Sequence, residues 1–347
     1  MLISVKKTTF IKSLASLLTL LCLLLCGCGN AAESSTPDKS NDISFEESHD
    51  KSKEKPSEAS AVPAASEESD ISEEPEVSDV KPQKETTKIA VFGDSIAYGY
   101  GLADRETEAF PFLLTASLRE TGKDFECENY AVNGHTSADM QSDISAADGL
   151  DESTDIVIIS IGANNLLGTA IATFSAVASS DPRFSPLLDG SASPDQLIAI
   201  LSQMGDALKE AFTSDPFKVS ALTGIAQLRA DIPSFISQIR AKAPNAKLYY
   251  QTVYNPYKGV TLMLSDGSVF DFGKMCDEYI AKLNDEIIEA ASKLHYTLVD
   301  VYSAFESGDV RLVNCNISGD GIPSIDPHPN ADGHALIAAL YGTALLG

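Results

Sequence analysis

One run of residues constrains the fold of this chain more than any other: Asp155–Ile161, which reads Asp-Ile-Val-Ile-Ile-Ser-Ile. Most of its members are β-branched, and apolar and polar residues do not alternate along it. β-branched side chains favour strands, and a strand without alternation is typical of one that is covered on both faces. The run therefore predicts an inner strand of a sheet that has helices on both sides.

Other apolar runs and helical patterns alternate along residues 88–347. Further strands are expected at Lys88–Phe92, Phe125–Val132, Lys247–Val253 and Thr297–Tyr302. Apolar residues recur with helical spacing in Phe110–Glu120, Ser234–Ala243, Met275–Leu294 and Ala331–Leu345. Strands that alternate with helices are typical of a parallel sheet. We therefore expect an α/β fold with a central parallel sheet of about five strands, whose order the pattern does not give.

Residues 166–232 are too many for an ordinary connection between the third strand and the helix at Ser234–Ala243. They contain helical patterns such as Leu197–Phe212, and these patterns are broken by Pro182, Pro186, Pro194 and Pro216. We expect a helical insert after the third strand. It would serve either as a lid or side wall of a site, or as an addition without such a role.

The first 28 residues have the pattern of an export signal. Three lysines precede an apolar run at residues 14–25, which is too short to span a membrane. The following Leu-Cys-Gly-Cys resembles the lipobox of bacterial lipoproteins, with a small residue directly before Cys28. We expect an exported protein whose lipidated Cys28 anchors it to the cell membrane, with the domain facing outside. A soluble secreted protein is the alternative.

Residues 29–86 are richer in acidic residues, Ser and Pro than residues 87–347. They hold sixteen Asp and Glu, six Lys, many Ser, Pro and Ala, and no period that would bury a face. Such a segment cannot offset the entropy of ordering, so we predict a disordered acidic linker before a folded domain at residues 87–347.

The formal net charge of the chain is -25. Nucleic acid is therefore not an expected partner, because phosphate binding requires a basic surface.

The predicted domain contains three cysteines, Cys127, Cys276 and Cys315. An odd number leaves at least one that is free or pairs outside the domain, and the sequence does not give their disulfide state. Neither paired cysteines nor a His-x3-His pair occurs in this domain. We therefore expect no metal and no cofactor.

Four short segments fall where predicted strands end or directly before the last helix. They are Gly93-Asp94-Ser95-Ile96, Asn133-Gly134-His135-Thr136, Gly162-Ala163-Asn164-Asn165 and Asp326-Pro327-His328-Pro329-Asn330. Parallel sheets bind their ligands outside the carboxyl ends of the strands. Segments that are far apart in the sequence are therefore expected to meet at one edge of the sheet.

Ser95 and His328 are the residue types that nucleophilic catalysis requires. Ser95 comes directly after a strand at the start of a helix, where unpaired amides favour a developing oxyanion. Serine needs a base, and the histidine side chain titrates near neutrality; Asp326, two residues upstream, could fix its tautomer. The backbone amides of Ser95 and Gly134 and the side-chain amide of Asn164 would give an acyl-transfer intermediate three donors.

Taken together, the four segments resemble, in order, the sequence blocks of the SGNH (GDSL) hydrolase family, over the whole folded domain. Gly93–Ile96 is similar to the nucleophile block, Gly134 to the glycine of the second block, Gly162–Asn165 to Gly-x-Asn-Asp and Asp326–Pro329 to the last block. The resemblance implies a flavodoxin-like three-layer α/β/α fold and a metal-free ester hydrolase with a Ser-His-Asp triad. It also implies oxyanion donors at Ser95, Gly134 and Asn164.

The sequence departs from the family pattern at two positions. Asn165 stands where the third block usually has Asp, and we expect little effect because that position is not a primary catalytic group in the family. The family commonly places the triad acid three residues before the histidine, where this chain has Ile325. We assign the acid to Asp326; Asp320, or a backbone carbonyl that orients His328, is the alternative.

Other polar residues near these segments are expected to be structural. Asp94 would cap the backbone after the first strand rather than react. His135 has no assigned role beside its block, His334 on the last helix would pack or lie at the surface, and Asp300 would be structural.

Two functions of different class are consistent with these patterns. The first is a cell-surface carboxylic-ester hydrolase that forms an acyl-enzyme on Ser95 and acts on lipid, thioester or O-acetylated glycan substrates. The second is a weakly active or inactive binding protein of the cell envelope, which only the irregular last block supports. The residues do not name the substrate. Side chains of the insert that could line an apolar acyl pocket are Leu166, Leu167, Phe174, Leu187 and Leu188.

Overall fold

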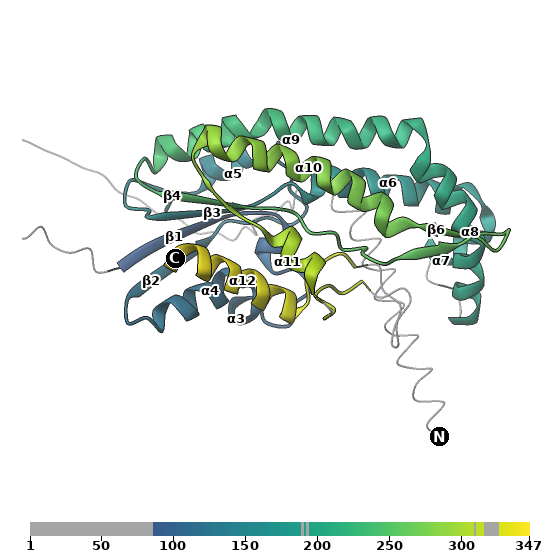
Figure 1. Cartoon of the computed structure of the whole chain (residues 1–347), viewed down its shortest axis with the longest axis horizontal. Helices are drawn as coiled ribbons and strands as arrows, with labels where there is room; N and C mark the ends of the chain where they lie inside the picture. Colours follow the sequence, from purple (N-terminus) through teal and green to yellow (C-terminus); the bar gives the residue numbers. More distant parts are fainter. Residues whose placement is uncertain (1–85, 189–190, 192–193, 309, 316–325) are drawn as a thin grey trace, which may run out of the picture. The chain divides into compact units, whose positions relative to one another are not determined.

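The computed structural model describes residues 86–347 except 189–190, 192–193, 309 and 316–325. In this part of the chain a sheet of five parallel strands has helices on both faces (Figure 1). The predicted three-layer α/β/α fold is thereby confirmed. The predicted signal at 1–28 and nearly all of the predicted linker lie outside the described residues, so the Cys28 anchor stays a prediction.

The strand order in the sheet is β2-β1-β3-β4-β7. The strands are β1 (Thr86–Gly93), β2 (Asp124–Asn129), β3 (Ile156–Ser160), β4 (Lys247–Gln251) and β7 (Thr297–Val299). The first begins at Thr86, inside the predicted linker, because that residue pairs with Asp124 of β2. The fifth ends three residues before the predicted Tyr302, because Asp300 caps the next helix instead. A small antiparallel hairpin, β5 (Thr261–Met263) and β6 (Val269–Asp271), was not expected from the sequence.

The described helices include all the predicted ones, and several are longer than expected. They are α2 (Ser95–Tyr98), α3 (Arg105–Glu108), α4 (Phe110–Arg119), α5 (Met140–Ala146), α6 (Ala163–Ser180), η1 (Pro182–Phe184), α7 (Ser185–Leu188), α8 (Pro194–Thr213), α9 (Asp215–Lys242), α10 (Phe272–Leu294), α11 (Val301–Ser307) and α12 (Ala331–Leu346).

Alternate side chains of each inner strand enter opposite cores. In β1, Ala90 and Phe92 pack with α5, α9 and α10, whereas Ile89 and Val91 pack with α4 and α12. Strand β3 has the same period of two, and all five of its residues are buried. The continuous apolar run at residues 155–161 thus marks the middle strand of the sheet, between β1 and β4.

The expected helical insert is present, but its predicted boundary at residue 232 is wrong. Helix α9 continues through Pro233 and includes the predicted helix Ser234–Ala243. Pro182, Pro194 and Pro216 stand in the first turns of η1, α8 and α9. Proline is favoured there because the first amides of a helix have no partner within it, so these prolines begin helices rather than break them.

Asn165, in the first turn of α6, joins the insert to the loop after β2. Its Oδ1 accepts a hydrogen bond from the Ser137 amide at 3.1 Å, and its Nδ2 donates to Ser137 Oγ at 2.8 Å and to Gly224 O at 3.2 Å. Ser137 Oγ donates in turn to Asp231 Oδ2 on α9 at 2.7 Å. A Cβ at Gly224 would overlap Asn165 O, so α9 can approach α6 this closely only because residue 224 is glycine.

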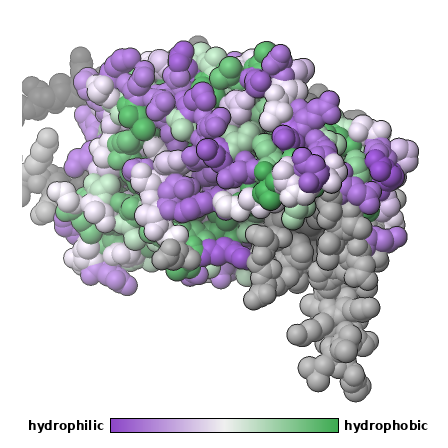
Figure 2. Space-filling view, turned by 45° about the vertical axis from the view of Figure 1, so that its right-hand side comes forward, coloured by the Kyte–Doolittle hydropathy of each residue, from purple (hydrophilic) through white to green (hydrophobic). Residues whose placement is uncertain are grey.

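None of the helices in the described ranges is long and apolar enough to cross a membrane. On the face shown in Figure 2, apolar residues form small groups among hydrophilic ones. The most exposed large apolar side chains of the insert and the hairpin are Val219, Leu222, Met263 and Val269.

The Asn165 network leads to a prediction for Asn165→Asp, which restores the residue usual in the family. The carboxylate would lose both donated hydrogen bonds and would place a second negative charge near Asp231. Because Asn165 and Ser137 are buried, we expect the variant to lose about 1–3 kcal/mol of unfolding free energy, measured by urea denaturation. The double variant with Asp231→Asn should recover part of the loss. An unchanged unfolding midpoint in Asn165→Asp would contradict this account.

Candidate active site

Ser95, His328 and Asp326 form one chain of hydrogen bonds at the carboxyl edge of the sheet. His328 Nε2 lies 2.9 Å from Ser95 Oγ, and His328 Nδ1 lies 2.6 Å from Asp326 Oδ1. A carboxylate can only accept, so Nδ1 carries the imidazole proton and Nε2 offers its lone pair to the serine hydroxyl. His328 is 3% exposed and Ser95 9% exposed, so the pair is screened from bulk water.

The turn between β1 and α2 places Ser95 at this edge. A Cβ at Gly93 would overlap Ser160 O of β3, so only glycine fits where the two strands end side by side. Asp94 N donates to the same carbonyl oxygen at 3.1 Å. Ser95 is the first residue of α2, and its amide has no acceptor inside the helix because the first amides of any helix lack one.

Asp94 caps this helix, as expected from the sequence. Its Oδ1 accepts from the Ile96 amide at 2.9 Å, and its Oδ2 has no hydrogen-bond partner among the described residues. Burial raises the pKa of Asp94 to about 7, against the opposing effects of the Ile96 hydrogen bond and of His328. The carboxyl group therefore keeps its proton to near-neutral pH, because ionisation in this dry position is unfavourable.

Asp326 reaches His328 from two residues upstream because the chain turns tightly around Pro327. Besides its bond to the imidazole, Asp326 Oδ1 accepts from the His328 backbone amide at 3.1 Å. The Tyr254 hydroxyl donates to Pro327 O at 2.8 Å, and the Asn314 amide donates to His328 O at 2.9 Å. The imidazole is thus held at its backbone as well as at its ring. Asp320, the alternative acid, lies outside the described residues.

The last helix, α12, carries this loop to the serine by packing against α4. The Tyr341 ring stacks on Phe110 with centroids 5.5 Å apart, and the His334 ring stacks on the same side chain. His334 Nδ1 accepts from the Phe110 amide at 3.3 Å. Burial lowers the pKa of His334 to about 4, so it is a neutral packing residue rather than a surface one.

One of the predicted oxyanion donors, the side-chain amide of Asn164, already makes a hydrogen bond within the protein. Asn164, in the first turn of α6, donates from Nδ2 to His135 O at 2.9 Å. An amide nitrogen has two hydrogens, so a second donor remains for a ligand. His135 Nδ1 lies 2.9 Å from Asp143 Oδ2, which fixes the loop that contains Gly134. The roles of Gly134 and Asn164 as oxyanion donors stay predictions.

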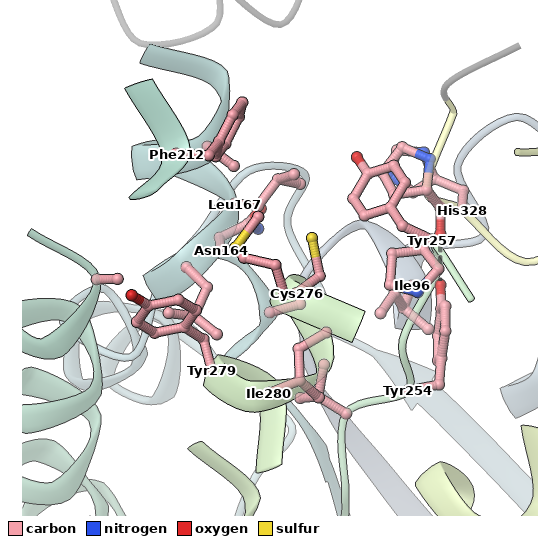
Figure 3. Close-up of a pocket in the computed structure, with 18 of the residues that line it drawn as sticks. Ile96, Asn164, Leu167, Phe212, Tyr254, Tyr257, Cys276, Tyr279, Ile280 and His328 are labelled. Carbon is pink, nitrogen blue, oxygen red and sulfur yellow. Dashed lines mark hydrogen bonds between the residues drawn. The ribbon is translucent and has the colours of Figure 1, made fainter. Parts of the chain in front are cut away.

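An apolar pocket opens beside the Ser95–His328 pair (Figure 3). It encloses about 780 Å³ of empty space, its open mouth included. The insert contributes Leu166, Leu167, Ala170, Phe212, Phe217 and Ala221. Of the five apolar residues proposed from the sequence, Leu166 and Leu167 line the pocket, and Phe174 packs within the insert. The side chains of Leu187 and Leu188 lie outside what the structure describes.

Several residues of the pocket were not anticipated from the sequence. They are Val253, Tyr254, Pro256 and Tyr257 after β4, and Met275, Cys276, Tyr279 and Ile280 on α10. The rule that ligands bind at the carboxyl ends of parallel strands applies equally to β4 and would have indicated Tyr254. Helix α10 carried no such signal, because its apolar spacing is the same whether it covers a core or a pocket.

The three cysteines of the described region are free. Cys276 lies in the pocket wall, and burial raises the pKa of its thiol, so the thiol stays protonated. Because the thiolate is the nucleophilic form of cysteine, this residue acts as an apolar side chain of the wall.

The sequence matches the GDSL-like lipase/acylhydrolase family over residues 91–336. Among solved structures, the lipase Lip_vut3 from a goat rumen metagenome is similar, with a TM-score of 0.50, 15% identity and coverage of 75% of this chain and 98% of that one. An extracellular lipase from Streptomyces rimosus and phospholipase A1 from Streptomyces albidoflavus NA297 both have TM-scores of 0.49. Their identities are 18% and 20%, over 75% of this chain and 100% and 99% of theirs. Among curated proteins nothing matches.

The family match spans well over half of the chain and includes all four segments that meet at the edge of the sheet. At such low identity the similarity to Lip_vut3 bears on the fold alone, and it agrees with the three-layer arrangement. The chain therefore belongs to the GDSL-like lipase/acylhydrolase family and is an ester hydrolase.

Proposed function

We propose that this protein is a serine hydrolase of carboxylic esters with apolar acyl chains. The observation that carries the proposal is the Ser95–His328–Asp326 hydrogen-bond chain beside a pocket with apolar walls. An apolar pocket favours burial of methylene groups, each of which contributes about 0.8 kcal/mol of binding free energy. An acetyl group would leave most of such a pocket empty, so longer acyl chains are favoured over O-acetylated glycans.

The reaction begins at Ser95. His328 Nε2 accepts the hydroxyl proton while Ser95 Oγ attacks the acyl carbonyl, and Asp326 stabilises the imidazolium that forms. The amides of Ser95 and Gly134 and the free hydrogen of Asn164 Nδ2 donate to the oxyanion. His328 then returns the proton to the leaving alcohol, and an acyl-enzyme remains on Ser95. Water activated by the same imidazole releases the acid and restores the serine.

The reason to consider a binding protein without turnover was the unusual position of the triad acid. Asp326 lies within hydrogen-bond distance of His328 Nδ1 in spite of that position, so this reason disappears. Export and a lipid anchor at Cys28, as predicted from the sequence, would bring membrane lipids within reach of the pocket.

Replacement of the nucleophile is the first test. We expect Ser95→Ala to lower kcat for p-nitrophenyl octanoate by about 10³-fold or more, because no other group takes over the attack. A fluorophosphonate probe should label the wild type and not the variant. Ser160→Ala is the matched control. It removes a buried serine hydroxyl at the end of β3, beside β1, and this hydroxyl has no hydrogen-bond partner among the described residues. Equal turnover in Ser95→Ala and wild type would refute the proposal.

The choice of triad acid is tested separately. We expect Asp326→Asn to lower kcat by about 10²–10⁴-fold, because the amide no longer stabilises the imidazolium or selects the tautomer. Asp320→Asn should retain a rate close to that of the wild type. The opposite ranking of the two variants would show that Asp326 is not the acid that orients His328.

The buried Asp94 carboxyl predicts how stability changes with pH. An unfolded chain releases this proton near pH 4, whereas the folded chain holds it to about pH 7. The folded state binds more protons between these values, so this group stabilises the fold at low pH and the contribution is lost as pH rises through 7. We expect Asp94→Asn to gain up to about 4 kcal/mol relative to wild type between pH ~4 and pH ~8, measured by urea unfolding. A difference that is constant with pH would contradict the buried, protonated state.

A further inference from the structure

A second cavity, which is an open groove on the surface of the insert, adjoins the active-site pocket at Phe217. Its described lining comes from α6, from the end of α8 and from the start of α9, and encloses about 890 Å³ of empty space with its opening included. The lining residues are Thr169, Ala172, Thr173, Ala176, Val177, Ser180, Ala211, Ser214, Pro216, Phe217 and Ser220. Most of these side chains are small, and Ala172, Ala176 and Ser220 are exposed, so the groove is open to solvent. The hydroxyls of Thr169 on α6 and Ser220 on α9 lie 3.0 Å apart, within hydrogen-bond distance.

Phe217 is the one described residue that lines both cavities. In Figure 3 Phe212 and Tyr279 lie at the side of the active-site pocket away from His328. The Phe217 ring contacts both, with centroids 5.0 Å from Phe212 and 5.5 Å from Tyr279. Phe217 therefore stands at the far end of the pocket, where an acyl chain that extends from Ser95 would stop.

The phenyl ring is held in place from several directions. Its own amide donates to Ser214 Oγ, the N-cap of α9, at 3.3 Å. Phe212 and Tyr279 present their edges to it at interplanar angles of 69° and 87°, and the side chain is 8% exposed. A ring fixed by a helix cap and two aromatic neighbours acts as a rigid wall.

We propose that Phe217 is the specificity-determining residue that sets the longest acyl chain the enzyme accepts, by closing the active-site pocket against the second cavity. The inference rests on the proposed function, because it takes the pocket beside Ser95 to be the acyl site. Without the phenyl ring the two cavities join. Chains too long for the closed pocket then extend along the open groove that α6 and α9 line.

The test measures kcat/KM for p-nitrophenyl butyrate, octanoate, dodecanoate and palmitate with the wild type and Phe217→Ala. We expect the wild type to discriminate against the longest esters. In Phe217→Ala the palmitate-to-octanoate ratio should rise about tenfold or more, because methylenes that the closed pocket excludes can then contact the apolar surface of the groove.

Phe184→Ala is the matched control. Phe184 belongs to the same apolar cluster of the insert and is 2% exposed, but it lines neither cavity. Its replacement removes the same ring from the same cluster and should leave the length ratio unchanged. Phe217→Leu keeps most of the packing and should move the ratio in the same direction by less, so it carries the test if Phe217→Ala does not fold.

The outcomes separate this inference from the function on which it rests. A wild type that hydrolyses esters through Ser95, together with folded Phe217 variants that keep its length profile, would overturn the inference and leave the proposed function intact. An equal rise in the ratio for Phe184→Ala would also overturn it, because loosening of the insert would then be the cause. A wild type that hydrolyses none of the esters would overturn both.

Discussion

The hydrogen bond between Ser95 and His328 depends on the packing of α12 against α4. These two residues are separated by 233 positions, and the helix that follows the loop of His328 helps to place the imidazole beside the serine. Phe110 is the contact point, since it stacks on both Tyr341 and His334 of α12 and donates its amide to the second. His334, which the sequence left as either a packing or a surface residue, is therefore a neutral part of the core. Its packing brings the catalytic imidazole to the serine.

The insert supplies much of the apolar wall of the pocket beside the Ser95–His328–Asp326 hydrogen-bond chain. Strands β1 and β3 deliver the serine and Asn164 to the edge of the sheet, but they supply little surface for a substrate. Helices α6, α8 and α9 supply one wall and α10 supplies another, and both walls are apolar. The Asn165–Ser137–Asp231 network ties α6 and α9 to the loop that contains Gly134. The groups that would select the acyl chain and those that would bind the oxyanion are thus parts of one packed unit.

Much of this could be predicted from the sequence, for identifiable reasons. The run at residues 155–161 required cover on both faces, so it indicated a strand of a parallel sheet with helices on both sides. The rule for carboxyl ends of strands then indicated Ser95 and Asn164. The sequence could not place the walls from α10, because an apolar helical stripe does not say whether it covers a core or a pocket. It also could not show that Pro216 begins a helix and that Pro233 lies within it, since proline is compatible with the first turn of a helix and unfavourable only farther in.

The amino-acid sequence alone was enough to establish the class of fold, the residues that meet at the edge of the sheet and the type of chemistry. The class of fold and the meeting of these residues depend on local preferences, on side-chain periodicity and on the general rule for parallel strands, whereas ester hydrolysis was implied by the resemblance of four segments to a known family. Tertiary contacts were needed to show that Asp326 reaches the imidazole from an unusual position, through a turn held by Tyr254 and Asn314. They were needed, too, to place Phe217 between two cavities. Both outcomes arise from contacts between segments far apart in the chain, and no local pattern of residues encodes the distance between such segments.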